Sequence, residues 1–194
     1  MKPMGSLVTA VVLAAALPVF AVQTDNHGIH AVPAPHSTGS GQAGKIMIDG
    51  KLDDWDLSGQ VLQCYDIEAL KDIYSGEIAM MYDADSLYVS IHWKDPTPMG
   101  NTHEPHYQSG KGWAGDCVQL RIKTDQICHV TAWCYAEKQE PFINIHYGKS
   151  LQEPFGGVDK NFFRTDGWKL SDGVEMGFLK DKDGKGYVQE IKLP

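Results

Sequence analysis

Apolar and polar residues alternate most regularly between residues 116 and 122, which read DCVQLRI. Every second residue from Val118 onward is apolar, and the residues between them include Gln119 and Arg121. A period of two is typical of a β-strand that buries one face and exposes the other. We therefore expect a strand here, with an apolar inner face and an outer face that carries an amide and a guanidinium.

Further segments combine alternating or continuous apolar residues with flanking turn residues, which predicts more strands. They cover residues 46–48, 61–65, 77–82, 87–94, 128–135, 142–147, 174–180 and 187–193. The third and fourth of these segments are separated by a short turn, and the last two by an Asp- and Gly-rich tip, so each pair predicts a hairpin. The pattern predicts an all-β domain over residues 45–194, an antiparallel β-sandwich of immunoglobulin-like or jelly-roll-like form.

Matching the apolar sets of neighbouring strands predicts their register. Pairing the strand described first with residues 128–135 places Gln119 opposite Trp133 and Arg121 opposite Thr131. Cys117 then points away from Cys134, so no disulfide between them is expected.

Polar and aromatic side chains gather on the outer face of this predicted pair. His129 shares that face, and Asn144 and His146 extend it if residues 142–147 pair next. Planar hydrogen-bonding groups beside aromatic rings suit a polyhydroxylated ligand. The candidate ligand-binding residues are Trp113, Gln119, Arg121, Trp133, His129 and Asn144.

The N-terminus has the pattern of an export signal. Lys2 precedes an apolar stretch over residues 7–17, and cleavage is expected after Ala21. The stretch is short for a membrane span of ~20 residues. Residues 22–44 are rich in Gly, Pro, Ser and His, without a hydrophobic period, which predicts a disordered linker. The sequence thus predicts a signal peptide (1–21), a linker (22–44) and an extracytoplasmic domain with no stable membrane insertion.

The net charge and the cysteine content indicate which partners and which cross-links the chain can have. The 194 residues carry a net charge of −8, which argues against nucleic acid or an anionic membrane as partner. Export permits disulfides among the four cysteines. If Cys128 and Cys134 share one strand, they are ~20 Å apart and cannot pair. Metal binding by the cysteines is not indicated, because no C-x-x-C spacing occurs.

Acidic residues suggest a possible structural calcium ion. Carboxylates at Asp49, Asp53, Asp54 and Asp56 can supply its oxygen ligands, and the tip over residues 181–186 looks like half of a calcium loop. The same residues equally suit turns, helix N-caps and an Asp-Gly hairpin. Both interpretations remain open from the sequence.

Four motifs in order resemble the family 9 carbohydrate-binding modules: IDGKLDDW from Ile48, MYDADSLYVSIHWKDP from Met81, GWAGDCVQLRI from Gly112, and GYVQEIKLP from Gly186. The family consists of β-sandwich domains appended to secreted polysaccharide-degrading enzymes. The resemblance implies a noncatalytic domain that grips the end of a glycan chain between two Trp rings.

In this resemblance, Trp113 corresponds to one of the two Trp rings on which the sugar stacks. Gln119 occupies a position that is usually acidic in the family, and His129 or Thr131 would match its basic residue. The second Trp would follow Pro194, so the resemblance predicts a domain that is incomplete at the C-terminus.

A haem b-binding periplasmic electron-transfer domain of related sandwich shape is the main alternative, because HWKDPTPM resembles such domains too. Covalent c-type attachment is excluded, since no C-x-x-C-H occurs. Axial ligands would come from His, Met or Lys side chains. The candidates are His92, Lys94, Met99, His103 and His106. A catalytic role is not indicated, because nucleophile, metalloprotease and phosphate-loop motifs are missing.

Overall fold

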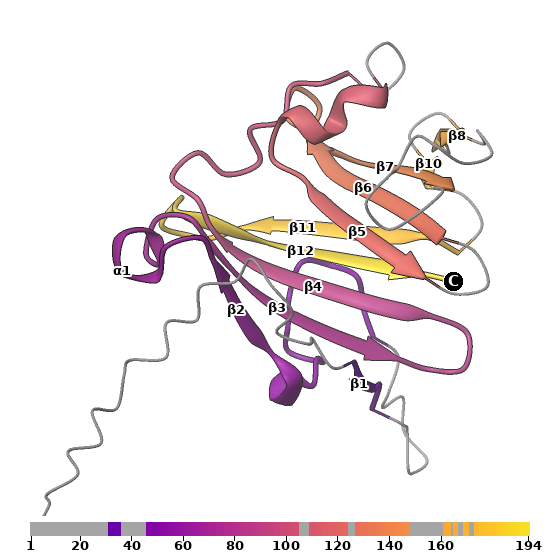
Figure 1. Ribbon diagram of the computed structural model, residues 1–194, viewed down its shortest axis with the longest axis horizontal. Coiled ribbons are helices and arrows are strands. Elements are labelled where there is room, and N and C mark those ends of the chain that lie inside the picture. The colour runs from indigo at the N-terminus through magenta and orange to yellow at the C-terminus, as the bar shows by residue number, and fades with distance from the viewer. Residues whose placement is uncertain are drawn as a thin grey trace, which may run out of the picture.

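The fold is all-β, with antiparallel sheets, in a computed structural model (Figure 1). The structure describes residues 31–35, 46–104, 109–123, 127–147, 161–163, 165–166, 169–170 and 173–194. The predicted signal peptide lies outside these residues. None of the described helices has the length and apolar character that a membrane span requires.

The larger sheet has six strands and contains both predicted hairpins. Its strands are β1 (Val32–Pro33), β2 (Val61–Cys64), β3 (Ser75–Tyr82), β4 (Leu87–Lys94), β11 (Glu175–Lys180) and β12 (Gly186–Leu193). The order is β1-β3-β4-β12-β11, with β2 also paired to β3. The hairpins β3–β4 and β11–β12 are confirmed, and β12 brings the second hairpin against β4.

The smaller sheet has the order β5-β6-β7-β8. Its strands are β5 (Val118–Lys123), β6 (Ile127–Tyr135), β7 (Glu140–Tyr147) and β8 (Asn161–Phe163). The short strands β9 (Thr165–Asp166) and β10 (Lys169–Leu170) pair separately. Helical turns are few among the described residues: η1 (Leu57–Gly59), α1 (Ile67–Leu70) and η2 (Ser109–Ala114).

The register of β5 and β6 differs from the prediction by two residues. Gln119 lies opposite Thr131, and Arg121 lies opposite His129. The predicted register was wrong because a shift of two residues leaves the same side chains on the same faces, so the apolar pattern does not distinguish the two pairings. The predicted faces of the two strands are therefore retained.

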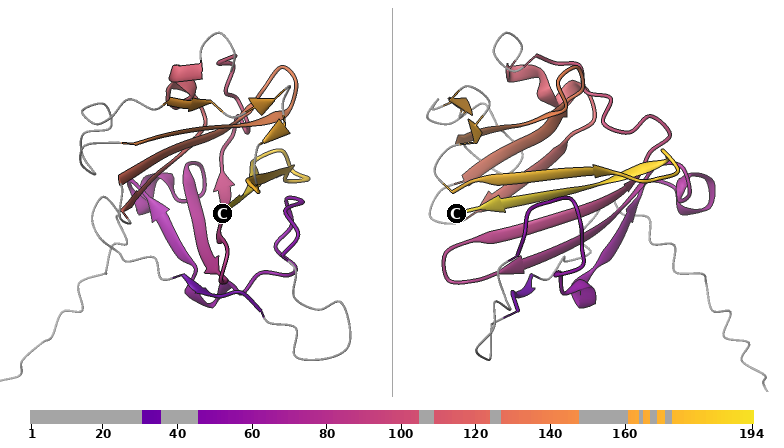
Figure 2. Two further views of the ribbon diagram at one scale, coloured as in Figure 1. Left: turned by 90° about the vertical axis from the view of Figure 1, so that its right-hand side faces the viewer. Right: turned by 180° about the vertical axis from the view of Figure 1, so that it is seen from behind.

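A shared apolar cluster joins the two sheets, which lie one above the other in Figures 1 and 2. It contains Val89, Ile91, Val118, Val130, Ala132, Ile143, Val174, Ile191 and Leu193. These residues come from the inner faces of both sheets, as the period of two predicts. Residues 118–122 of β5 thus place their apolar set in the core and leave the intervening residues outside.

The N-terminal part of the domain covers the opposite face of the six-stranded sheet. Ala34, Ile46 and Trp55 pack against outward residues of β3 and β4. The predicted strand at 46–48 is not formed, because Met47 donates its backbone N–H to Asp54 instead of to a neighbouring strand. Residues 31–35 lie within the predicted linker, and for them the prediction of disorder is wrong. In this segment β1 pairs in parallel with β3, and Ala34 is buried.

Candidate functional site

The outer face of the four-stranded sheet combines exposed and buried polar residues. Gln119 and Arg121 are exposed, whereas His129 and Asn144 are buried. The two exposed residues lie on the edge strand β5, while the buried pair lies on the interior strands β6 and β7. The prediction of one common polar face is confirmed, because Thr131 pairs with both Gln119 and Asn144. We expected every residue of this face to be accessible to a ligand, and this expectation is wrong for His129 and Asn144, which are buried.

Trp133 is not an exposed platform but part of the interior, with only 1% of its surface accessible. Its ring lies 4.4 Å from that of Phe142 between centroids, and its indole N–H donates to the carbonyl oxygen of His103. The expectation that Trp133 contacts a ligand is wrong, because the segment that ends in η2 covers its ring.

Gly112 makes that cover possible. A Cβ at this position would lie 2.3 Å from Cζ3 of Trp133, closer than any side chain permits. The buried amide of Asn101 donates to the carbonyl oxygens of Gly112 and Asp116, at 2.6 and 3.2 Å. The turn that carries Trp113 is therefore fixed at both ends. Sequence reasoning missed Asn101, whose only signal is its place in a loop rich in polar residues.

Trp113 projects from this fixed turn, and 56% of its surface is exposed. Of the predicted aromatic candidates it is the one that remains accessible. We use the name β5 face for Trp113, whose exposed indole ring precedes the edge strand β5, and for Gln119 and Arg121, the outward residues that follow on this strand.

A separate cleft of about 440 Å³ opens between the ends of β2, β3 and β4 and the residues that precede β5. Sequence reasoning missed it, because its lining comes from segments far apart in the chain. Its aromatic and acidic lining residues are Tyr65, Tyr74, Trp93, Asp95, Asp116 and Tyr187. Trp93 is held by its indole N–H, which donates to the buried amide oxygen of Gln189 at 3.3 Å.

Asp95 and Asp116 form a pair of neighbouring carboxyls in this cleft. Burial raises the pKa of Asp116, and the charge and hydrogen bonding of Asp95 raise it further. The backbone N–H of Gly100, which donates to Asp116, acts in the opposite direction but does not outweigh them. Burial and the nearby Asp116 charge raise the pKa of Cys117 to about 11. Burial and the two carboxylates also raise the pKa of Tyr187, so its phenol stays protonated.

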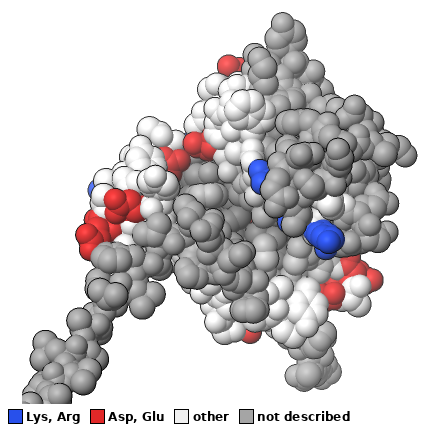
Figure 3. Space-filling model, in the orientation of Figure 1, with Lys and Arg blue, Asp and Glu red and all other residues white. Residues whose placement is uncertain are grey.

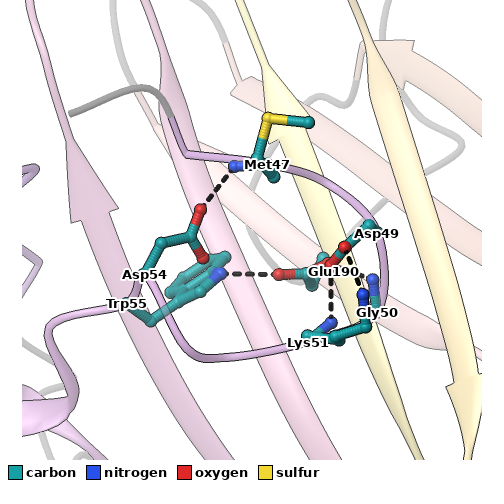
Figure 4. Close-up of polar contacts among 7 residues, drawn as sticks. All are labelled: Met47, Asp49, Gly50, Lys51, Asp54, Trp55 and Glu190. Atoms are coloured by element: carbon teal, nitrogen blue, oxygen red, sulfur yellow. Dashed lines mark hydrogen bonds and ion pairs between the residues drawn. The ribbon is translucent and has the colours of Figure 1, made fainter. Parts of the chain in front are cut away.

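Three of the acidic residues considered for calcium accept local hydrogen bonds. Asp49 accepts from the backbone and side chain of Lys51, and Asp54 accepts from Met47 (Figure 4). Asp56 caps η1 by accepting from the backbone N–H of Ser58. These bonds match the turn and N-cap interpretation.

The tip of the last hairpin is an Asp-Gly turn. Gly184 has a positive φ of 71° and donates its backbone N–H to Asp181. Within the described ranges, no three His, Cys, Asp or Glu side chains are grouped so that they could hold a metal ion.

The haem-ligand candidates do not converge on one site. His92 lies on the outer face of β4 and pairs with Asp181 at 2.9 Å, whereas Met99 packs with Cys134 and Tyr187. Of the candidates, Lys94 lines the cleft, and His103 bonds through its backbone to Asn101. His106 lies outside the described residues.

No protein-family model matches this chain, and no curated protein matches it significantly. A functional assignment therefore depends on the geometry of the β5 face and the cleft.

Proposed function

We propose that this chain is a noncatalytic, extracytoplasmic domain that binds oligo- or polysaccharides, built as an antiparallel β-sandwich of immunoglobulin-like or jelly-roll-like form. The observation that carries the proposal is Trp113, which is 56% exposed although its turn is held rigidly by Gly112 and Asn101. An accessible aromatic residue on a backbone turn that is already held in place loses less conformational freedom when a ligand stacks on it than one on an unanchored loop.

Sugar rings present apolar C–H faces and a rim of hydroxyl groups. The indole of Trp113 can cover the apolar face, while Gln119 and Arg121 donate to hydroxyl oxygens and the Gln119 amide oxygen accepts from a hydroxyl. Covering on the order of 100 Å² of the indole stabilises a complex by roughly 2–3 kcal/mol. That contribution suits a weak, reversible glycan interaction.

The experiment is a screen of immobilised glycans with the full chain, followed by calorimetric titration of the best oligosaccharide. Trp113→Ala should weaken binding at least tenfold, because it removes the stacking surface. Tyr82→Ala is the matched control, since Tyr82 is an exposed aromatic residue on β3, away from the β5 face. Failure of every glycan to bind, or equal affinity of Trp113→Ala and the parent chain, would refute the proposal.

The haem alternative is tested by the absorption spectrum of the purified protein. A sharp Soret band would replace the carbohydrate proposal with the electron-transfer one. The expected spectrum contains only the absorption of aromatic side chains.

A further inference from the structure

The carboxyls of Asp95 and Asp116 accept few hydrogen bonds from the rest of the protein. Oδ1 of Asp95 accepts from the backbone N–H and hydroxyl of Thr97, and Oδ2 of Asp116 accepts from Gly100. Among the described residues, the remaining hydrogen bond of this pair is the one between the two carboxyl groups themselves. Lys94 also lines the cleft, but it forms no ion pair with them in the part of the chain that the structure describes. In the described part of the chain, two acidic groups thus share a cleft without a cation that is ion-paired with them.

Aromatic side chains form the walls around this pair. Tyr65 and Tyr74 flank the segment that contains α1, and they are 76% and 53% exposed. Trp93 also lines the cleft, and its ring lies 6.2 Å from that of Tyr187 between centroids. Aromatic faces attract cations placed within ~6 Å of the ring. The cleft therefore combines negative charge with surfaces that favour an organic cation.

The surroundings of the cleft are acidic as well. Residues 65–74 contain Asp66, Glu68 and Asp72 against the single cation of Lys71. Figure 3 shows acidic side chains on the projection that α1 forms. A local excess of one charge raises the concentration of oppositely charged ligands near a cleft.

A metal ion is a poorer occupant than an organic cation. Calcium takes six to eight oxygen ligands and magnesium requires an octahedral set, whereas the cleft offers two carboxyls and otherwise mainly aromatic walls. A primary ammonium group has three N–H donors, so it can replace the proton that the two carboxyls share and donate to both of them at once. Its apolar body would then lie against the tyrosine rings.

We propose that this cleft binds a small primary ammonium compound with an apolar or aromatic body, held by Asp95 and Asp116 and covered by Tyr65 and Tyr74. A volume of about 440 Å³ is within the range of small-molecule sites. The site is separate from the β5 face and does not depend on the carbohydrate proposal, because Trp113 does not line it.

The experiment compares 2-phenylethylammonium with the neutral, similarly shaped 2-phenylethanol by calorimetry or NMR titration of the full chain. The ammonium compound should bind at least tenfold more tightly. Asp95→Asn and Asp116→Asn should each reduce its affinity at least tenfold, since each keeps an oxygen for its backbone donor but removes the charge. Tyr65→Ala with Tyr74→Ala should weaken it several-fold, and Tyr82→Ala should not.

Thermal unfolding of each variant confirms that it is folded before titration. No binding of the ammonium compound, equal binding of the alcohol, or unchanged affinity in both Asn variants would overturn the proposal. Trp113→Ala should leave ammonium binding unchanged. Glycan binding and ammonium binding can therefore fail independently.

Discussion

The indole N–H of Trp55 donates a hydrogen bond of 2.6 Å to Oε1 of Glu190, across 135 residues of sequence (Figure 4). Glu190 is fully buried on β12, and its other carboxyl oxygen accepts from the backbone N–H of Gly50. The two bonds fasten the N-terminal cover to the six-stranded sheet. They also give a structural reason for the joint presence of the IDGKLDDW and GYVQEIKLP motifs, because one supplies both donors and the other supplies the acceptor.

Glu190 should make the stability of the domain depend on pH. Burial, opposed by its hydrogen bonds to Gly50 and Trp55, raises its pKa to about 7 from an ordinary value of 4.5. Between these values the folded protein holds a proton that the unfolded chain has released, so the free energy of unfolding falls as pH rises. Chemical denaturation should show a loss of about 1–3 kcal/mol between pH 5 and pH 8.

Glu190→Gln is the control for this effect. The amide does not titrate, so the slope between pH 5 and pH 8 should flatten. Asp116, whose pKa is also raised, contributes a slope of the same sign. The amide side chain would place its NH₂ group opposite an N–H donor, that of Trp55 or Gly50, so one of the two hydrogen bonds would be lost. This loss should lower the free energy of unfolding at every pH by about 1–3 kcal/mol. An unchanged slope in the variant would show that other groups cause the dependence.

Gly112→Ala should damage both the fold and the proposed glycan site. Its methyl group would overlap the ring of Trp133, and relief requires movement of the turn that carries Trp113. Overpacking of this kind costs about 1–3 kcal/mol, and glycan affinity should fall with it. Gly184→Ala is the control variant. A methyl group at this position meets open space, but the positive φ of 71° is strained, so the free energy of unfolding should fall by about 1–2 kcal/mol. Glycan affinity should not change. Equal glycan affinity in the two variants would contradict the link between Gly112 and Trp113.

The strands of this domain were predictable because their side-chain pattern is local. Eight predicted strands, among them 77–82 and 87–94, recur in the structure with small changes at their ends. The assignment of Gln119 and Arg121 to an outer face was likewise correct, since it depends only on the period of two. The pairing of β5 with β6 was predicted, but its register was not recoverable in the same way, because the alternative registers differ by an even shift.

The covering segments could not be predicted from such patterns. Trp133 lies on the polar face of β6 and becomes buried only because Gly112 lets a distant turn close over it. Trp55 and Glu190 are joined by a hydrogen bond between distant parts of the sequence, which no local pattern indicates. The cleft also depends on segments brought together by the tertiary fold, and neither Asp95 nor Asp116 carries a local signal of its partner.

All four cysteines should be free thiols. None of them is paired in the structure, and Cys64 and Cys134 are buried. Burial raises the pKa of Cys134 to about 11, so little thiolate forms at neutral pH. Thiol titration in denaturant without reductant should give four groups per chain, and alkylation of the folded protein at pH 7.5 should be slow at Cys134. Two groups per chain in denaturant would indicate a disulfide and contradict this arrangement.

The contribution of β5 to glycan binding should decline along the strand. Gln119, Arg121 and Lys123 are all exposed and share one face, but successive members lie ~7 Å farther from the Trp113 end. A sugar stacked on Trp113 reaches the nearest of them most readily. Gln119→Ala should therefore weaken oligosaccharide binding more than Arg121→Ala does, and Lys123→Ala should change it less than twofold. The measurement is calorimetric titration with one oligosaccharide under matched salt, since screening affects the charged residues alone. If Lys123→Ala weakens binding as much as Gln119→Ala, the ligand lies along the whole strand rather than at the indole ring.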